Sequence, residues 1–324
     1  MTAPQILCIG ELLFDYLADQ PGQSLDTVKT WTPYPGGAPA NVACALTRLG
    51  TPSAYLGCIG QDPDGYALAQ VLSDLGVNLE GLQRHSQAPT RIVYVTRTLE
   101  GDRHFAGFGT TDTTAFADAH LQASVLPETL FPTAQFLVLG TLALAYPNSR
   151  ESIYHALELS KTYGLSTLVD LNWRPVFWPN PSEATPLIHS VLAQADFIKL
   201  AHEEAELFFD SSNPQAVVER YPQVKGVFVT AGEHGCRYWL GGITGSEPAF
   251  PVNVVDTTGA GDSFTAGLLH QLCQQPDLKN PQTVRDIVRY ASAVGALTTL
   301  QAGAIAAQPT ATQVEIFLAT TSAQ

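Results

Sequence analysis

The chain of 324 residues is poor in positive charge. It has 16 lysines and arginines against 30 aspartates and glutamates, which gives a formal net charge of −14 at pH 7. This balance argues against nucleic acid or an anionic membrane surface as the main partner, because both are themselves negatively charged. A small anionic ligand is still compatible with it, since a local group of backbone amides can bind an anion against the overall field.

Cysteine is also scarce, and no long hydrophobic run occurs. The five cysteines are odd in number and widely spaced, with no C-x-x-C pair, so neither a disulfide framework nor a zinc site is expected. The first residues lack the basic start and the long apolar run of a signal peptide. The longest weakly polar stretch near the end, "GALTTLQAGAIAA", has 13 residues, which is too short to span a bilayer. We therefore expect a soluble, cytoplasmic protein with free, buried thiols.

What the chain does contain is a succession of short apolar runs with helical patterns between them. Several runs are continuously apolar, which is typical of strands that are buried on both faces of a parallel sheet. Residues 149–164 predict a helix that begins at the capping residue Ser149 and ends at Gly164. This alternation predicts an α/β fold with a doubly wound, mainly parallel sheet and helices on both faces. The runs occupy residues 6–10, 54–60, 135–140, 166–172, 196–200 and 227–232.

Two segments, 12–35 and 90–108, do not fit this alternation. Both read as extended but partly polar, and the second predicts a hairpin that turns at residues 100–102. No clear linker or repeat divides the chain. We expect the two segments to form a small β-sheet that acts as a lid over one edge of the site, inserted into a single domain of residues 1–324.

The segment "DTTGAGDSF" at 256–264 places small residues between two carboxylates. The preceding residues, 250–256, predict a strand, and Phe264, Leu268 and Leu272 predict the buried face of a helix that follows. The small residues then form a strand-to-helix turn. Backbone amides at the start of such a helix have no partner within it and bind anions, and without bulky side chains the backbone can approach a phosphate closely.

Asp262 lies near the start of this helix, where the helix dipole favours its ionised form. A carboxylate beside a phosphate site is unfavourable for binding alone, because like charges repel. It is useful where it accepts a proton from a hydroxyl that attacks the phosphate. The residues leave open a second interpretation, in which Asp262 only caps the helix and the glycines only form the turn.

The same segment closely resembles the second signature of the ribokinase-like sugar kinases, the PfkB family, and "GGAPANVA" at 36–43 resembles the first. The two occur in the family's order and at the expected ends of the chain. The resemblance implies a ribokinase-like three-layer fold and transfer of the γ-phosphate of ATP, with Mg²⁺, to a sugar or nucleoside hydroxyl. No G-x-x-x-x-G-K-[ST] is present, which excludes a P-loop kinase. The resemblance extends over nearly the full length and includes "GELLFD" at 10–15, "IGQDPDG" at 59–65, "DLNWRPVFW" at 170–178 and "TAGEHG" at 230–235.

The resemblance assigns the chemistry to the second signature. Asp262 is expected to be the general base, and the amides of Gly259, Ala260, Gly261 and Asp262 to form the anion hole for the transferring phosphoryl group. Short carboxylates and amides suit a sugar, because they pair with vicinal hydroxyls. The pair of glycines in the first signature also resembles the family's lid hinge. The expected sugar-binding residues are Asp15, Gly36, Gly37, Asn41, Arg103 and Arg174.

The resemblance also implies nucleotide and metal sites. Glu204 matches the glutamate of the family's Asn-x-x-Glu run, which organises magnesium-bound water, but Ala201 stands at the asparagine position. His234 likewise stands where a lysine is common. Asp256 and the Thr258 carbonyl match a position that binds a monovalent cation such as K⁺ in some members. The expected ATP-binding residues are Lys199, Glu204, Thr230, Gly232, Gly235 and Ser292.

Two segments narrow the substrate. "DLNWRPVFW" resembles a run of fructokinases and 2-keto-3-deoxygluconate kinases, and the tail "QAGAIAAQPT" resembles fructokinases. Only Arg103 and Arg174 are candidates to pair with an acidic sugar, so the resemblance favours fructose, a neutral ketose, with fructose 6-phosphate as the product. Kinases for 2-keto-3-deoxygluconate, ribose or a nucleoside are the alternatives within the family.

Two further classes of function are alternatives to a kinase. A catalytically silent sugar sensor of the same family is an alternative, although such proteins tend to lose Asp262 and the glycines beside it. An NAD-dependent oxidoreductase fits the fold, but no G-x-G-x-x-G follows the first strand. Family members often pair through the lid, and the strand "RIVYVT" at 91–96 is apolar enough to permit a homodimer.

Overall fold

The computed structural model describes residues 2–98, 103–110, 112–274 and 277–321. Its main feature is a nine-stranded sheet in the order β13-β12-β11-β10-β9-β8-β1-β4-β5. Neighbouring strands are parallel from β5 to β11, and β12 and β13 add an antiparallel edge. The strands are β1 (Ile6–Ile9), β4 (Ser53–Gly60), β5 (Asn78–His85), β8 (Phe136–Leu139), β9 (Ser166–Asp170), β10 (Phe197–Ala201), β11 (Gly226–Thr230), β12 (Cys236–Leu240) and β13 (Ile243–Glu247).

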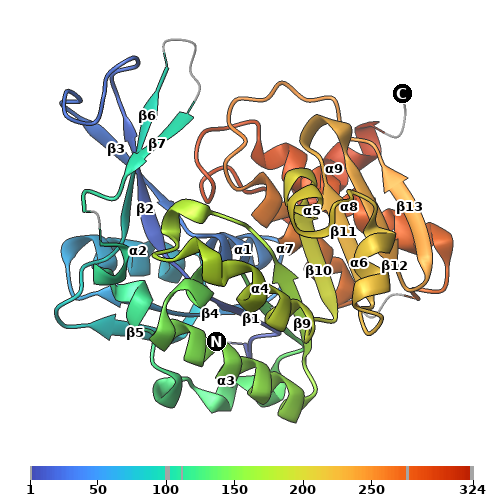
Figure 1. Ribbon diagram of the computed structural model, residues 1–324. Coiled ribbons are helices and arrows are strands. Elements are labelled where there is room, and N and C mark those ends of the chain that lie inside the picture. Colours follow the sequence, from blue (N-terminus) through green and yellow to red (C-terminus); the bar gives the residue numbers. More distant parts are fainter. Residues whose placement is uncertain (1, 99–102, 111, 275–276, 322–324) are drawn as a thin grey trace.

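Helices cover both faces of this sheet (Figure 1), and two hydrophobic cores result. Successive side chains of a strand point to opposite faces, so Leu7 and Ile9 of β1 join one core while Ile6 and Cys8 join the other. The first core packs against α3 (Pro147–Tyr163), α4 (Ala184–Leu192), α5 (His202–Phe209) and α6 (Pro214–Arg220). The second packs against α1 (Ala38–Arg48), α2 (Pro63–Asp74), α7 (Ala260–Leu272), α8 (Pro281–Thr298) and α9 (Ala311–Thr321).

This three-layer arrangement confirms the predicted α/β fold with a doubly wound, mainly parallel sheet. The continuously apolar runs are the buried strands, and all four residues of β1 are fully buried. The carboxyl ends of β8 to β11 lie along one edge of the sheet, which is where ligands of doubly wound folds bind.

A second, four-stranded sheet stands away from the main one (Figure 1), as expected from segments 12–35 and 90–108. Its strands pair β2 with β3 antiparallel, β2 with β6 parallel and β6 with β7 antiparallel. The predicted turn at residues 100–102 lies outside the described residues. The strands are β2 (Leu13–Ala18), β3 (Trp31–Gly36), β6 (Ile92–Arg97) and β7 (Arg103–Gly107).

The prediction of a strand at residues 250–256 is wrong. The segment follows β13, the outermost strand of the main sheet, and is irregular. The amides of Val255 and Asp256 donate to the carbonyl of Thr299, just after α8, so they have no strand as partner. Val254 and Val255 are 57% and 66% exposed, so their apolar character did not indicate burial.

The prediction that Ser149 caps a helix is also wrong. Helix α3 begins two residues earlier, at Pro147, because proline is favoured in the first turn of a helix. The Ser149 hydroxyl is buried and donates to the carbonyl of Asp118 at 2.6 Å instead. The predicted end of the helix is correct, since Gly164 adopts the left-handed conformation there.

Within the described ranges, none of the helices combines the length and the apolar character that a membrane crossing requires.

Candidate active site

The turn at Gly259 begins α7 and requires a glycine for two reasons. Its φ is 77°, in the left-handed region, and a Cβ atom there would lie 2.6 Å from the Cβ of Ala304. The Ala260 amide donates to the carbonyl of Thr257 at 3.2 Å. The next two amides, of Gly261 and Asp262, lie in the first turn of α7, where backbone N–H groups have no intrahelical acceptor. The turn therefore presents amide donors as an anion site requires.

Asp262 projects from this first turn and meets a side chain from α1. The Asn41 amide donates to Oδ2 of Asp262 at 2.8 Å. Burial and, to a smaller extent, the charge of Asp170 raise the pKa of Asp262 to about 6, against the lowering effects of the Asn41 hydrogen bond, Lys199 and Arg174. A carboxylate with a pKa near 6 is ionised at neutral pH and still basic enough to accept a proton from a reacting hydroxyl.

Lys199 supplies a buried positive charge beside the turn. Its ammonium lies 3.1 Å from Oδ1 of Asp170, at the end of β9, and the other oxygen of Asp170 accepts from the Thr265 hydroxyl of α7 at 3.1 Å. A Cβ atom on Gly261 would lie 2.9 Å from the ammonium. Burial lowers the pKa of Lys199, but the carboxylates of Asp170, Glu204 and Asp262 raise it by more, so the side chain is charged.

Asp170 was not among the predicted site residues. Its sequence signal was its position as a carboxylate within the apolar run 166–172, at the ligand-binding edge of the sheet.

Glu204 of α5 ties two strand ends together. Its two carboxylate oxygens accept from the Trp173 amide at 2.6 Å and from the Ala201 amide at 2.7 Å. Burial is the main cause that raises its pKa. Asn172, which directly precedes Trp173, has a φ of 42°, which is uncommon for a residue other than glycine. The carboxylate therefore fixes the segment that follows β9.

The predicted sugar-binding residues of the first signature lie where the small sheet joins the body. A Cβ atom on Gly36 would lie 2.9 Å from Oδ2 of Asp15, so the carboxylate rests on the glycine of the neighbouring strand. Gly37, with a φ of 105°, precedes α1, and a Cβ atom there would lie 2.4 Å from the carbonyl of Glu11. Gly37 is thus required both by its close approach to backbone and by its backbone conformation, whereas a side chain at position 36 would displace the Asp15 carboxylate.

Glu11 is a further buried group that the sequence analysis did not single out. One of its carboxylate oxygens accepts from the Ala38 amide at 2.9 Å, at the start of α1. Its burial raises its pKa to about 7. Glu11 thus fixes the N-terminal end of the helix that carries Asn41, and a polar residue in the run "GELLFD" was the signal for it.

The structure describes the side chain of one of the two predicted arginines, Arg174. Arg174 is exposed in the segment after β9 and donates to the carbonyl of Trp173 at 2.9 Å. Its charge lowers the pKa of Asp262. Arg103 begins β7, and its side chain lies outside the described part of the chain.

The predicted nucleotide residues follow β11 and line the adjoining helix. Thr230 ends β11, and Gly232 and Gly235 adopt φ values of 54° and 84° in the turn after it. A Cβ atom on Gly235 would lie 2.2 Å from the carbonyl of Glu247, so no other residue fits there. Ser292 of α8 is half-buried and lies one turn before Gly295, which approaches the carbonyl of Ala260. His234 is exposed.

Asp256 joins two loops beside the anion turn. Its Oδ1 accepts from the amide and the hydroxyl of Thr258, at 3.0 and 2.7 Å, and its Oδ2 accepts from the Gly303 amide at 2.8 Å. Asp256 as a whole is only 7% exposed. These bonds hold the segment that leads into Gly259 against the loop after α8.

The contact between Asn41 and Asp262 yields a measurable pKa. In Asn41→Ala the carboxylate loses a hydrogen bond that favours its charged form, so we expect the pKa of Asp262 to rise above its value of about 6. The pKa of Asp262 is about 6 in the folded protein and 3.8 for an ordinary aspartate, so the folded state holds this proton more tightly. The free energy of unfolding therefore falls as the pH rises from 3.8 to about 6, where Asp262 ionises.

Carbon-13 NMR titration of the carboxyl groups measures this shift. Asn213→Ala, which removes the cap of α6 instead, is the matched control and should leave the Asp262 midpoint unchanged. An unshifted Asp262 midpoint in Asn41→Ala would show that the hydrogen bond does not stabilise the carboxylate.

Comparison with known proteins identifies the family. Residues 3–311 match the model of the pfkB family carbohydrate kinases. The probable fructokinase-6 of Arabidopsis thaliana, described as chloroplastic, is 36% identical over 313 residues, which are 95% of this chain and 80% of that protein.

Two solved structures have the same fold. Fructokinase with bound ATP from Xylella fastidiosa superposes with a TM-score of 0.88 at 29% identity and covers 98% of both chains. A double mutant of fructokinase from Vibrio cholerae O395, with fructose, ADP and potassium ion bound, gives a TM-score of 0.84 at 30% identity, with 98% of this chain and 100% of that chain covered. The two signatures and this agreement in sequence and fold lead to one conclusion: the chain belongs to the PfkB family of carbohydrate kinases.

Proposed function

We propose that the protein is an ATP-dependent fructokinase, which transfers the γ-phosphate of ATP to D-fructose and forms fructose 6-phosphate. The observation that carries the proposal is the Asp262 carboxylate, held by Asn41 at the N-terminus of α7 and next to the Lys199 ammonium. The names of the related proteins, and the fructose and ADP bound in one of their structures, support fructose as the acceptor.

In this mechanism Asp262 is the general base. Its Oδ2 is held by Asn41, which leaves Oδ1 to accept the proton of the attacking sugar hydroxyl. The amides of Gly261 and Asp262 and the Lys199 ammonium face the oxygens of the transferring phosphoryl group, where negative charge must be stabilised. Ala260 contributes to the shape of the turn, because its amide is already bonded to Thr257.

A divalent ion such as Mg²⁺ fits this site only as part of the nucleotide complex. Within the described residues, no three acidic, histidine or cysteine side chains gather as a metal site. Both oxygens of Glu204 accept backbone amides, so Glu204 would act on the ion through water. Magnesium commonly keeps several waters and takes its other ligands from phosphates. When bound, the ion neutralises charge on the phosphate oxygens.

The sugar site is proposed to consist of the predicted residues around the base of the small sheet. Asp15 and Asn41 supply a carboxylate and an amide for sugar hydroxyls, and Gly36 and Gly37 let the backbone approach. Of the two predicted arginines, Arg174 is the one whose side chain the structure describes, and its positive charge lowers the pKa of Asp262. This observation favours 2-keto-3-deoxygluconate, an acidic sugar, as the second candidate substrate.

We also propose a reducing compartment such as the cytoplasm, because all five cysteines are free and four of them are buried. Cell fractionation tests this location, and recovery in an oxidising compartment would contradict it.

The function is tested by ADP release from Mg-ATP with fructose, 2-keto-3-deoxygluconate, ribose, glucose or adenosine as acceptor. We expect fructose to give the highest rate. Asp262→Asn keeps the size of the side chain but cannot accept the proton, so kcat should fall by about 10²- to 10⁴-fold while ATP still binds.

Asp286→Asn, an exposed change on α8, is the control and should retain full activity. Near-normal turnover of Asp262→Asn would disprove its role as the base. No release with any acceptor would favour the silent sugar sensor.

A monovalent cation site at Asp256 and Thr258 is proposed from their place beside the anion turn. If K⁺ binds there, the initial rate should be higher in potassium chloride than in tetramethylammonium chloride of equal ionic strength. Asp256→Asn should abolish the difference between the two salts. Equal rates of the unaltered protein in both salts would exclude a functional potassium site.

A homodimer through the small sheet is proposed from its aromatic side chains. Trp31 and Tyr94 lie 4.9 Å apart between ring centroids, and Phe105 on β7 is 43% exposed. Sedimentation velocity should therefore show a dimer, and Phe105→Glu should shift it to a monomer. Ile316→Glu, on the exposed side of α9, is the matched control. Sedimentation of the unaltered protein as a monomer at micromolar concentration would contradict the proposal.

A further inference from the structure

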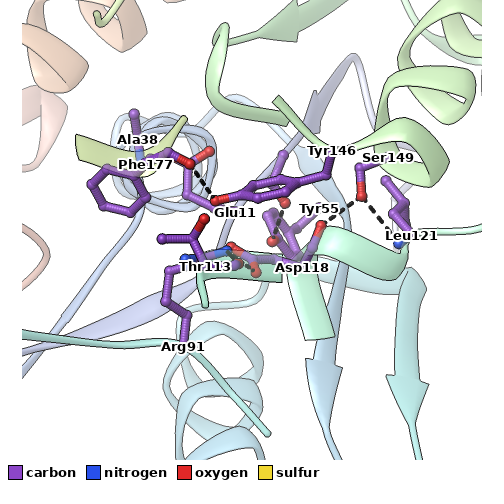
Figure 2. Close-up of polar contacts among 11 residues, drawn as sticks. Glu11, Ala38, Tyr55, Arg91, Thr113, Asp118, Leu121, Tyr146, Ser149 and Phe177 are labelled. Carbon is purple, nitrogen blue, oxygen red and sulfur yellow. Dashed lines mark hydrogen bonds and ion pairs between the residues drawn. The ribbon is translucent and has the colours of Figure 1, made fainter. Parts of the chain in front are cut away.

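Arg91 is a buried cation at the base of the small sheet, outside the residues that the proposed mechanism uses. It precedes β6, and it is 1% exposed. Its carbonyl accepts the amide of Phe14 in β2 at 3.1 Å, so its backbone joins two strands of the small sheet. Its side chain meets groups of the body of the protein (Figure 2).

The side chain of Arg91 is fixed by a two-pronged ion pair. Its Nε lies 2.6 Å from Oδ2 of Asp118, and its Nη2 lies 2.8 Å from Oδ1 of the same residue and 3.0 Å from the carbonyl of Thr113. The carbonyl of Asp118 in turn accepts the Ser149 hydroxyl of α3, as Figure 2 shows. Such a bidentate pair fixes orientation as well as distance. The base of the small sheet is therefore anchored to α3 through one guanidinium.

Four aromatic rings surround the same guanidinium. Its central carbon lies 4.5 to 5.5 Å from the centroids of the four rings. Phe108 directly follows β7, and Phe177 belongs to the segment that carries Arg174. These two rings contact each other edge to face at 4.8 Å. The four rings are Phe108, Phe116, Tyr146 and Phe177.

Tyr146 strengthens the connection to the segment after β9. Its hydroxyl donates to the carbonyl of Phe177 at 2.8 Å (Figure 2). Arg91 directly precedes β6 in the chain, and its carbonyl accepts the amide of Phe14 in β2. Its guanidinium packs on Phe108, which directly follows β7. Through Phe177 it contacts the segment after β9.

Arg91 contacts one residue near each of two predicted sugar-binding residues, Asp15 and Arg174. Phe14, which donates to the Arg91 carbonyl, is adjacent in sequence to Asp15. Phe177, which packs on the guanidinium, lies three residues after Arg174. A shift of the guanidinium would therefore displace both groups together.

We infer that Arg91, held by Asp118, is a positioning residue that couples the small sheet to the segment 171–178, so that Asp15 and Arg174 reach the sugar in a fixed relation. The identity of the ligand as a sugar rests on the proposed function. The mechanical coupling rests on the contacts of Arg91 alone.

The test replaces the pair without leaving a buried charge. Arg91→Met combined with Asp118→Leu exchanges both partners for apolar side chains of similar volume, which a folded core tolerates better than the loss of one partner. Arg91→Lys keeps the charge but loses the fork and is the second variant, in case the double variant fails to fold. Arg285→Met is the control, because that ion pair with Glu247 lies on α8 and β13.

We expect both variants to bind ATP with unchanged affinity and to lose about 10- to 100-fold in kcat/KM for fructose, mainly through KM, because the sugar contacts are misplaced. Hydrogen exchange without sugar should become faster in β2, β6 and residues 171–178 together, and Arg285→Met should change neither readout. A purely structural pair would lower the melting temperature and leave KM for fructose unchanged.

Normal KM for fructose and unchanged exchange in Arg91→Lys or in the double variant would overturn the inference. If the unaltered protein phosphorylates no sugar, the proposed function fails. The exchange readout then still decides the coupling, since it needs no substrate: joint loss of protection in the three segments supports it, and loss in only one segment contradicts it.

Discussion

The site depends on one hydrogen bond between helices that lie at opposite ends of the sequence. The amide of Asn41 in α1 donates to the carboxylate of Asp262 in α7, over a separation of 221 residues. The two helices lie on the same face of the main sheet and share one core, so the bond is made by packing rather than by local sequence. It orients the carboxylate and offsets part of the cost of burying its charge. Gly37 and Glu11 position the start of α1, and Gly259 positions the start of α7.

Around this bond, carboxylates and one ammonium are buried close together, and their charges set one another's ionisation. Asp170 raises the pKa of Asp262, while Lys199 lowers it and is itself held charged by three carboxylates. Such a cluster is costly to bury, and it persists because hydrogen bonds from backbone and side chains occupy its oxygens. The result is a base with a raised pKa beside a cation that is suited to phosphate, within a chain of net charge −14.

Much of this candidate site can be predicted from the two signatures, because their chemistry is local. Glycine at 259 is required by the φ of its own residue, and a helix start provides amides wherever it occurs. Features that depend on contacts between distant elements were not predicted. Asp170 and Glu11 are single carboxylates in apolar runs, and their partners come from other elements. The valines of segment 250–256 predicted a strand, but burial depends on neighbours, and no further strand lies outside β13 in the described sheet.

The sequence by itself determined the class of fold, the family and the two small-residue turns, since these follow from period, composition and signatures that are read along the chain. Only the tertiary structure decided which groups face one another. Asn41 with Asp262, Lys199 with Gly261, Glu204 with Trp173 and Arg91 with its four rings are all contacts between separate elements. The physical reason is that pKa shifts, buried ion pairs and close approaches depend on distance in space and on desolvation, and both are set when the layers pack.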